Sequence, residues 1–241
     1  MNRVKRAVIM AAGTGSRMRH LTLTTPKPLV RVNGERMIDS VIGALHRNGI
    51  EEIHVVVGYR KECFASLPAD YPGLTLIENP WYDTCNNISS LYAAREYIED
   101  AIILDGDQLI RDDAALAPEF ERSGYNAVRL DGPTDEWVLT LNEEGIVTGC
   151  SRTGGDRGWR LVSISRWSAE DGRRLRACLE HEFNAGNRQI YWDDVALFCC
   201  PEQFSLGIRP MDAAAEQEID TLAELAEADP TYKSYLEENN Q

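Results

Sequence analysis

Strand-like apolar segments alternate with segments of helical periodicity through the first 110 residues, and this alternation constrains the fold most. Residues 6–13 read RAVIMAAG, a buried strand entering a turn, whereas residues 36–50 place apolar side chains at helical spacing and stop at Gly49. The pattern continues with strands at 52–59, 74–80 and 101–108 and a helix at 88–100. This βαβ alternation predicts an α/β fold, with a Rossmann-like, mostly parallel mixed sheet and helices on both faces.

The pattern changes after residue 111 to strands joined by glycine and acidic turns. Residues 137–167 predict such strands, and residues 169–183 predict a helix. The remaining segments predict, in chain order, a returning strand at 204–212, a strand end leading into a helix at 218–228 and a short helix at 231–241. Because neither a linker nor a repeat interrupts the chain, we expect a single domain over residues 1–241, with halves at 1–110 and 111–241.

The composition excludes several classes of function. The formal net charge of −14 opposes general binding to nucleic acid or to an anionic membrane. No apolar run approaches membrane-spanning length. The six cysteines form no Cys-x-x-Cys pair, so we interpret them as reduced thiols of a cytoplasmic protein.

The turn after the first strand, MAAGTGSRMRHLTLTTPKPL at residues 10–29, combines glycines with cationic side chains. It lacks the third glycine of a dinucleotide loop, where Met18 stands, and the Gly-Lys-Ser/Thr of a Walker loop. Its glycines allow backbone N–H groups to face phosphate oxygens, and Arg17 and Lys27 add charge-assisted donors. A glycine-rich loop with two solvated cations is the alternative, but the Pro-Lys-Pro-Leu segment favours phosphate binding. The candidate turn residues are Ala11, Ala12, Gly13, Thr14, Gly15 and Ser16.

Carboxylates occur at two distant places in the chain. Asp105 and Asp107 end the apolar strand at 101–108, where ligands gather in parallel sheets, and Glu218-Ile219-Asp220 precedes a helix. A strand-end aspartate is often a turn residue, and Asp220 could cap the helix in competition with Thr221. Mg²⁺ prefers hard oxygen ligands and binds one or two carboxylates together with substrate phosphates, so these groups are candidate ligands.

The glycine turn followed by Pro-Lys resembles the signature of the nucleotidyltransferases that make activated sugars and activated alcohols, Ala-Ala-Gly-x-Gly-Ser/Thr-Arg then Pro-Lys. The resemblance implies a fold of the nucleotide-diphospho-sugar transferase type, in which the turn wraps a nucleoside triphosphate and Lys27, with Arg17, stabilises phosphate charge during catalysis. It also implies that Asp107 and Asp220 hold Mg²⁺. Asp105 then lies beside the nucleotide, and Glu218 is a supporting candidate.

Aromatic residues gather in the second half of the chain. Trp137 begins the predicted strand segment at 137–167, and Tyr191 and Trp192 stand beside Asp193 and Asp194. Large aromatic side chains are more often part of the core. Clustered aromatics with an adjacent carboxylate can also hold a quaternary ammonium by cation–π attraction. The candidate acceptor residues are Trp137, Tyr191, Trp192 and Asp194.

The resemblance spans nearly the whole chain and becomes more specific with the motifs of the second half. DEWVL, RLVSISRW, YWDD and EID occur here in the order in which they recur in bacterial CTP:phosphocholine cytidylyltransferases, and so does the NP.Y...NN..SLY pattern. Tyr82 and Asn87 of that pattern are candidates for the nucleotide pocket. Gln108 follows the aspartate pair where some relatives carry Asn, a departure that leaves the carboxylates intact.

The expected reaction is the Mg²⁺-dependent transfer of CMP from CTP to phosphocholine, giving CDP-choline and pyrophosphate. Residues 1–110 would bind the nucleotide and residues 111–241 the acceptor. A phosphate monoester has a second pKa of about 6, so the attacking oxygen is already anionic and needs no general base. The alternative acceptors are 2-aminoethylphosphonate, phosphoethanolamine or a sugar 1-phosphate. A catalytically inactive nucleotide-binding regulator is an alternative of another class, and the oligomeric state, including a homodimer, stays open.

Overall fold

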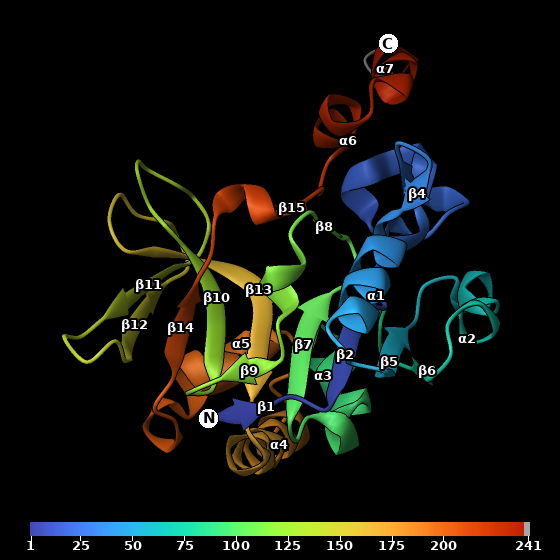
Figure 1. The fold of residues 1–241 in the computed structure, drawn as a ribbon. Coiled ribbons are helices and arrows are strands. Elements are labelled where there is room, and N and C mark those ends of the chain that lie inside the picture. Colours follow the sequence, from blue (N-terminus) through green and yellow to red (C-terminus); the bar gives the residue numbers. More distant parts are fainter. Residues whose placement is uncertain (239–241) are drawn as a thin grey trace.

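The computed structural model describes residues 1–238, which are built around a nine-stranded mixed sheet (Figure 1). One half of the sheet is parallel, with strands in the order β7-β2-β5-β6. These strands are β2 (Arg6–Ala11), β5 (Glu52–Val57), β6 (Leu74–Glu78) and β7 (Ala101–Asp105). Their carboxyl ends therefore lie at one edge, and the predicted α/β fold with a mostly parallel sheet is confirmed.

Helices cover both faces of the parallel strands because successive side chains of β2 point to opposite faces. Ala7 and Ile9 pack in one core cluster with the apolar side of α1 (Met37–Arg47). Val8 and Met10 pack in a second cluster with α3 (Ile88–Ala93) and α4 (Ala169–Asn184). Burial of both faces explains why these strands are continuously apolar in the sequence.

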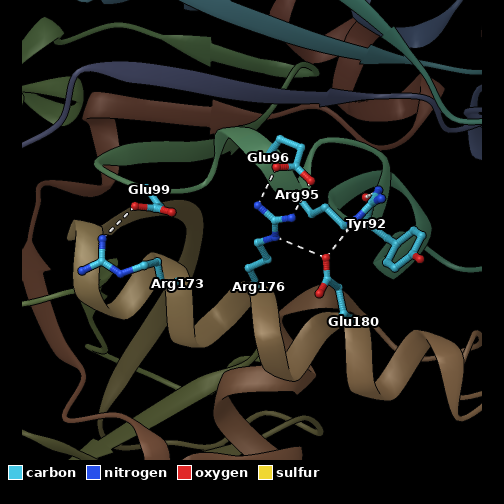
Figure 2. Close-up of polar contacts among 7 residues, drawn as sticks. All are labelled: Tyr92, Arg95, Glu96, Glu99, Arg173, Arg176 and Glu180. Carbon is cyan, nitrogen blue, oxygen red and sulfur yellow. Dashed lines mark hydrogen bonds and ion pairs between the residues drawn. The ribbon is translucent and has the colours of Figure 1, made fainter.

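Ion pairs connect α4 to the segment between α3 and β7 (Figure 2). Arg176 contacts Glu96 at 2.5 Å, and Arg173 contacts Glu99 at 2.9 Å. These side chains are partly exposed, so each pair contributes at most about 1 kcal/mol. Glu99 lies two residues before β7, so its pair with Arg173 lies near the end of that strand remote from its carboxyl terminus.

Antiparallel strands extend the sheet on the other side of β7. β13 (Trp159–Trp167) runs antiparallel to β7, β10 (Gly124–Arg129) pairs with β13, and β14 (Gly207–Pro210) returns parallel to β10. The hairpin of β11 (Val138–Leu141) and β12 (Val147–Ser151) lies at the margin (Figure 1). The strands predicted in residues 137–167 and the returning strand are confirmed, whereas the sequence did not predict β10.

Short elements complete the fold. Three small sheets pair β1 with β9, β3 with β4 and β8 with β15. These strands are β1 (Asn2–Arg3), β3 (Arg31–Val32), β4 (Glu35–Arg36), β8 (Gln108–Ile110), β9 (Glu119–Phe120) and β15 (Glu216–Glu218). The short helices are α2 (Leu67–Asp70), α5 (Trp192–Asp194), α6 (Leu222–Ala228) and α7 (Lys233–Glu238). Within residues 1–238, no helix has the length and apolar character needed to cross a membrane.

Candidate active site

The glycine turn at the end of β2 forms one wall of a cavity of about 240 Å³. Gly15 has a positive φ of 61°, and a Cβ atom there would lie 2.9 Å from the Cβ of Lys27, so the turn and the lysine segment approach closely. Ala12 does not line the cavity, and its carbonyl accepts a hydrogen bond from Tyr59 N–H. The lining residues are Met10, Ala11, Gly13, Thr14, Gly15, Ser16, Arg17, Lys27, Pro28, Asp107 and Asp220.

Lys27 joins the two carboxylates that line this cavity. Its Nζ lies 2.6 Å from Asp107 Oδ2 and 2.6 Å from Asp220 Oδ1, and the residue is only 5% exposed. Burial lowers the pKa of Lys27, but attraction and hydrogen bonding to the two aspartates outweigh it and raise that pKa above its usual value. Arg17 contacts Asp220 at 2.7 Å. Lys27 therefore remains a cation beside the turn.

The pairing of β15 with β8 brings the distant carboxylates to Asp107. Glu218 lies opposite Gln108 in this pair, which places residues 218–220 at the carboxyl edge of β7. One oxygen from each of Asp107, Glu218 and Asp220 lies within 4.8 Å of the others. Thr221, not Asp220, caps α6: its side chain accepts a hydrogen bond from Glu224 N–H. The Asp220 carboxylate is thus available to cations, and the alternative interpretation as a cap is wrong.

Asp105 ends β7 and feels the charges of carboxylates from two parts of the chain. Burial raises the pKa of Asp105 well above its usual value, and the charges of Asp107, Glu218 and Asp193 raise it further. Desolvation and the charge of Asp107 also raise the pKa of Glu218, although this side chain is exposed at the surface, which limits the effect of desolvation. Asp105 is therefore within electrostatic reach of carboxylates at the cavity and of Asp193 in the YWDD segment.

Three aromatic rings gather beside the YWDD segment. The ring centroid of Trp137 lies 5.6 Å from that of Tyr191 and 5.9 Å from that of Phe198, nearly perpendicular in both cases. Tyr191 is 48% exposed, and Phe198 is also exposed. We call Trp137, Tyr191 and Phe198 the aromatic patch. The structure thus brings together two of the three predicted aromatics and adds Phe198.

Trp192 does not join the aromatic patch. It is 3% exposed, and its ring packs near Tyr125 and Trp167, with centroids 6.2 and 6.4 Å away. The expectation that Trp192 faces a ligand is therefore corrected, because the first residue of α5 points its ring into the core. The side chain of Asn87 accepts a hydrogen bond from Trp192 N–H at 2.9 Å, so it holds this segment and does not line the cavity.

The two aspartates of the YWDD segment differ in their partners. Asp194 accepts a hydrogen bond from Tyr191 N–H and forms an ion pair with Arg152 at 2.6 Å. Burial raises the pKa of Asp193 to about 7. Arg152 gave no sequence signal because its carboxylate partner, Asp194, lies in a distant segment of the chain. The sequence placed Asp193 beside Asp194 as a carboxylate suited to a primary ammonium group, although it was not among the candidate acceptor residues.

Tyr82 packs against the strand end beside the glycine turn. A Cβ at Gly58 would lie 2.5 Å from the Cβ of Tyr82, and the Tyr82 and Tyr59 ring centroids are 6.5 Å apart. Tyr82 does not line the cavity of about 240 Å³. Its role in nucleotide binding stays a prediction.

The fold and this site together define a nucleotidyltransferase. Residues 7–182 match the family described as the MobA-like NTP transferase domain, and the chain belongs to this family. It is 42% identical to the 2-aminoethylphosphonate cytidylyltransferase of Lancefieldella rimae, an alignment that covers 94% of this chain and 92% of the relative. It is 31% identical to the choline-phosphate cytidylyltransferase of Streptococcus pneumoniae, over 79% of this chain and 82% of the relative.

Solved structures agree with this assignment. The CTP:phosphocholine cytidylyltransferase of Streptococcus pneumoniae matches with a TM-score of 0.86 and 28% identity, over 96% of this chain and 100% of that one. The inositol-1-phosphate CTP transferase of T. maritima, at 20% identity and a TM-score of 0.76 over 96% and 95% of the two chains, supports the fold. The chain is thus a nucleotidyltransferase whose full-length relatives include cytidylyltransferases.

Proposed function

We propose that this protein transfers CMP from CTP to 2-aminoethylphosphonate and releases pyrophosphate. The observation that carries the proposal is the cavity in which Lys27 and Arg17 stand beside Asp107 and Asp220, with Asp105 under the charges of both Asp107 and Asp193. A cationic, phosphorus-bearing acceptor would place its ammonium group among the carboxyl groups and its anion near the cations. The 42% identity to the Lancefieldella rimae enzyme supports the same acceptor.

The transfer would proceed by in-line displacement at the α-phosphorus of CTP. A phosphonate oxygen forms the new P–O bond, the bond from the α-phosphorus to the oxygen that bridges to the β-phosphorus breaks, and its electron pair leaves with pyrophosphate. An anionic phosphonate oxygen needs no general base, which agrees with a cavity whose lining includes no histidine among the described residues. Lys27, Arg17 and the N–H groups of the glycine turn would stabilise the phosphate charge by position.

The carboxylates of Asp107, Glu218 and Asp220 fit a magnesium site. One oxygen of each lies within 4.8 Å of the others, and carboxylate oxygens are the hard donors that Mg²⁺ prefers, one or two of them together with substrate phosphates. When bound, this ion would neutralise charge on the triphosphate. Lys27 contacts two of these carboxylates, so it would be free to turn towards the phosphates once they have another cationic partner.

The acceptor's primary ammonium group would bind at Asp193. The Asp193 side chain lies beside the Tyr125 hydroxyl, and its Oδ1 is buried. A primary ammonium has three N–H donors, whereas a trimethylammonium has none. Burial raises the pKa of Asp193 to about 7, and a cation beside Asp193 would favour its ionised form.

Phosphocholine is the second candidate acceptor. The Trp137–Tyr191 pair favours it, because aromatic faces attract quaternary ammonium groups. The TM-score of 0.86 to a phosphocholine enzyme supports it as well.

An acceptor panel tests the proposal. Pyrophosphate release is measured with CTP or UTP, Mg²⁺ and each of 2-aminoethylphosphonate, phosphoethanolamine, phosphocholine and glucose 1-phosphate. We expect the highest kcat/KM with CTP and 2-aminoethylphosphonate. A higher value with phosphocholine would establish the second candidate instead, and no release with any acceptor would favour a nucleotide-binding regulator.

A further inference from the structure

The aromatic patch already holds a cation that belongs to the chain itself. The guanidinium carbon of Arg152 lies 4.0 Å from the ring centroid of Phe198 and 5.6 Å from that of Trp137. Arg152 immediately follows β12, and its side chain is 47% exposed. It therefore reaches from the hairpin of the acceptor half onto the faces of two aromatic rings.

A buried carboxylate holds Arg152 on the side opposite to solvent. Arg152 Nη2 lies 2.6 Å from Asp194 Oδ1, and the Asp194 side chain is 2% exposed. Asp194 is fixed in turn by the hydrogen bond that it accepts from Tyr191 N–H at 2.9 Å. The guanidinium group is thus placed by aromatic faces and an anion, the same combination that a quaternary ammonium group requires.

We infer that Arg152 selects against quaternary ammonium acceptors by occupying their place on the aromatic patch. The inference rests on the proposed function, because it concerns the acceptor of that reaction. Two cations repel each other and cannot share the faces of Trp137 and Phe198, so a trimethylammonium group must displace Arg152 from Asp194. A primary ammonium group avoids this displacement because it can donate hydrogen bonds to Asp193.

The test compares Arg152→Met with the unchanged protein. Methionine keeps an unbranched apolar side chain but removes the charge, which frees the patch and leaves Asp194 able to attract an incoming cation. Both acceptors are assayed by pyrophosphate release at saturating CTP and Mg²⁺. We expect the ratio of kcat/KM for phosphocholine to that for 2-aminoethylphosphonate to rise about tenfold, mainly through a lower KM for phosphocholine.

A second variant and a matched control separate selection from structural effects. Arg152→Lys keeps the ion pair but loses the planar group that lies over Phe198, so its ratio should fall between those of the unchanged protein and Arg152→Met. If Arg152→Met does not fold, a rise in the ratio for Arg152→Lys supports the inference and an unchanged ratio overturns it. Arg173→Met breaks an exposed ion pair on α4 (Figure 2) and should leave the ratio unchanged.

The outcomes keep the inference distinct from the proposed function. An unchanged ratio in a folded Arg152→Met protein overturns the inference. A parallel loss with both acceptors also overturns it, since Arg152 would then serve the phosphorus-bearing group that both share. The acceptor preferred by the unchanged protein tests the proposed function separately: a preference for phosphocholine, together with a raised ratio in Arg152→Met, would refute that function and retain the role of Arg152.

Discussion

Replacing Lys27 by methionine should change catalysis and metal binding in opposite directions. The Lys27 ammonium contacts Asp107 and Asp220 at 2.6 Å each, so the variant leaves a group of carboxylates without its central cation. Loss of one partner of a buried ion pair costs about 3–5 kcal/mol of stability. Both aspartates are partly exposed and Arg17 stays 2.7 Å from Asp220, so we expect a smaller loss of about 1–2 kcal/mol.

Binding of Mg²⁺ without nucleotide should become tighter in Lys27→Met. A unit charge about 4 Å away contributes about 4 kcal/mol at an effective dielectric constant of 20, and the remaining arginine and solvent offset much of this. We therefore expect a gain of about 1.4 kcal/mol, or about tenfold in Kd. Turnover should fall about 10²–10³-fold, because the triphosphate loses a charge-assisted donor in the transition state.

Calorimetric titration with Mg²⁺ and pyrophosphate release measure the two effects. Lys61→Met is the matched control, since Lys61 forms an exposed pair with Glu78 at 2.5 Å and does not line the cavity. The control should leave both quantities unchanged. Weaker Mg²⁺ binding in Lys27→Met would refute the competition between this lysine and the ion, and near-normal turnover would refute its assignment to phosphate stabilisation.

Three further predictions concern the glycine turn, the aromatic residues and a buried carboxyl group. Gly15→Ala should lower the free energy of unfolding by about 1–2 kcal/mol in urea titrations, because its φ is 61° and a Cβ would lie 2.9 Å from the Cβ of Lys27. Gly13→Ala is the control: a Cβ there meets open space, so the free energy of unfolding should change by less than about 0.5 kcal/mol. Trp192→Ala should cost about 3–5 kcal/mol because the ring is buried, whereas Tyr191→Ala should mainly raise the acceptor KM. Glu216→Gln should flatten the pH dependence of unfolding: burial raises the pKa of Glu216 from 4.5 to about 7, so the folded protein holds a proton that the unfolded chain releases, and stability falls as pH rises through this interval. The free energy of unfolding of the variant should exceed that of the unchanged protein by about 3 kcal/mol at pH 8 and by less than about 1 kcal/mol at pH 5. An equal difference at both pH values would contradict the raised pKa.

The parallel half of the sheet could be predicted because its strands are buried on both faces. Residues 6–13 and 101–108 contain the apolar runs 7–12 and 101–104, and the structure places β2 and β7 there. β10 carries the buried polar residue Asn126, whose side chain donates to Ala115 O and accepts from Arg166. Those partners satisfy it from distant positions, so the local sequence gave no apolar pattern for this strand.

Local sequence patterns predicted the part of the site that lies in one segment, whereas the part where distant segments meet was predicted only from the family resemblance. The glycine turn and Lys27 lie within 20 residues of each other, and the structure brings them to one cavity. The meeting of Asp107 with Asp220 depends on the pairing of β8 with β15, which local periodicity does not reveal. Tyr191 and Trp192 are neighbours of similar chemistry, and the start of α5 directs one outward and the other into the core.

The charged side chains that line the cavity of about 240 Å³ already form ion pairs with one another. Lys27 is neutralised by Asp107 and Asp220, and Arg17 also contacts Asp220. A triphosphate alone would therefore meet cations that already have partners, beside carboxylates that repel it. A divalent cation supplied with the nucleotide changes this balance, because the aspartates gain another partner and the two side chains can turn to the phosphates. The proposed role of Arg152 follows the same logic: Arg152 and Asp194 already pair with each other, so an ammonium group that uses Asp193 would enter without separating them.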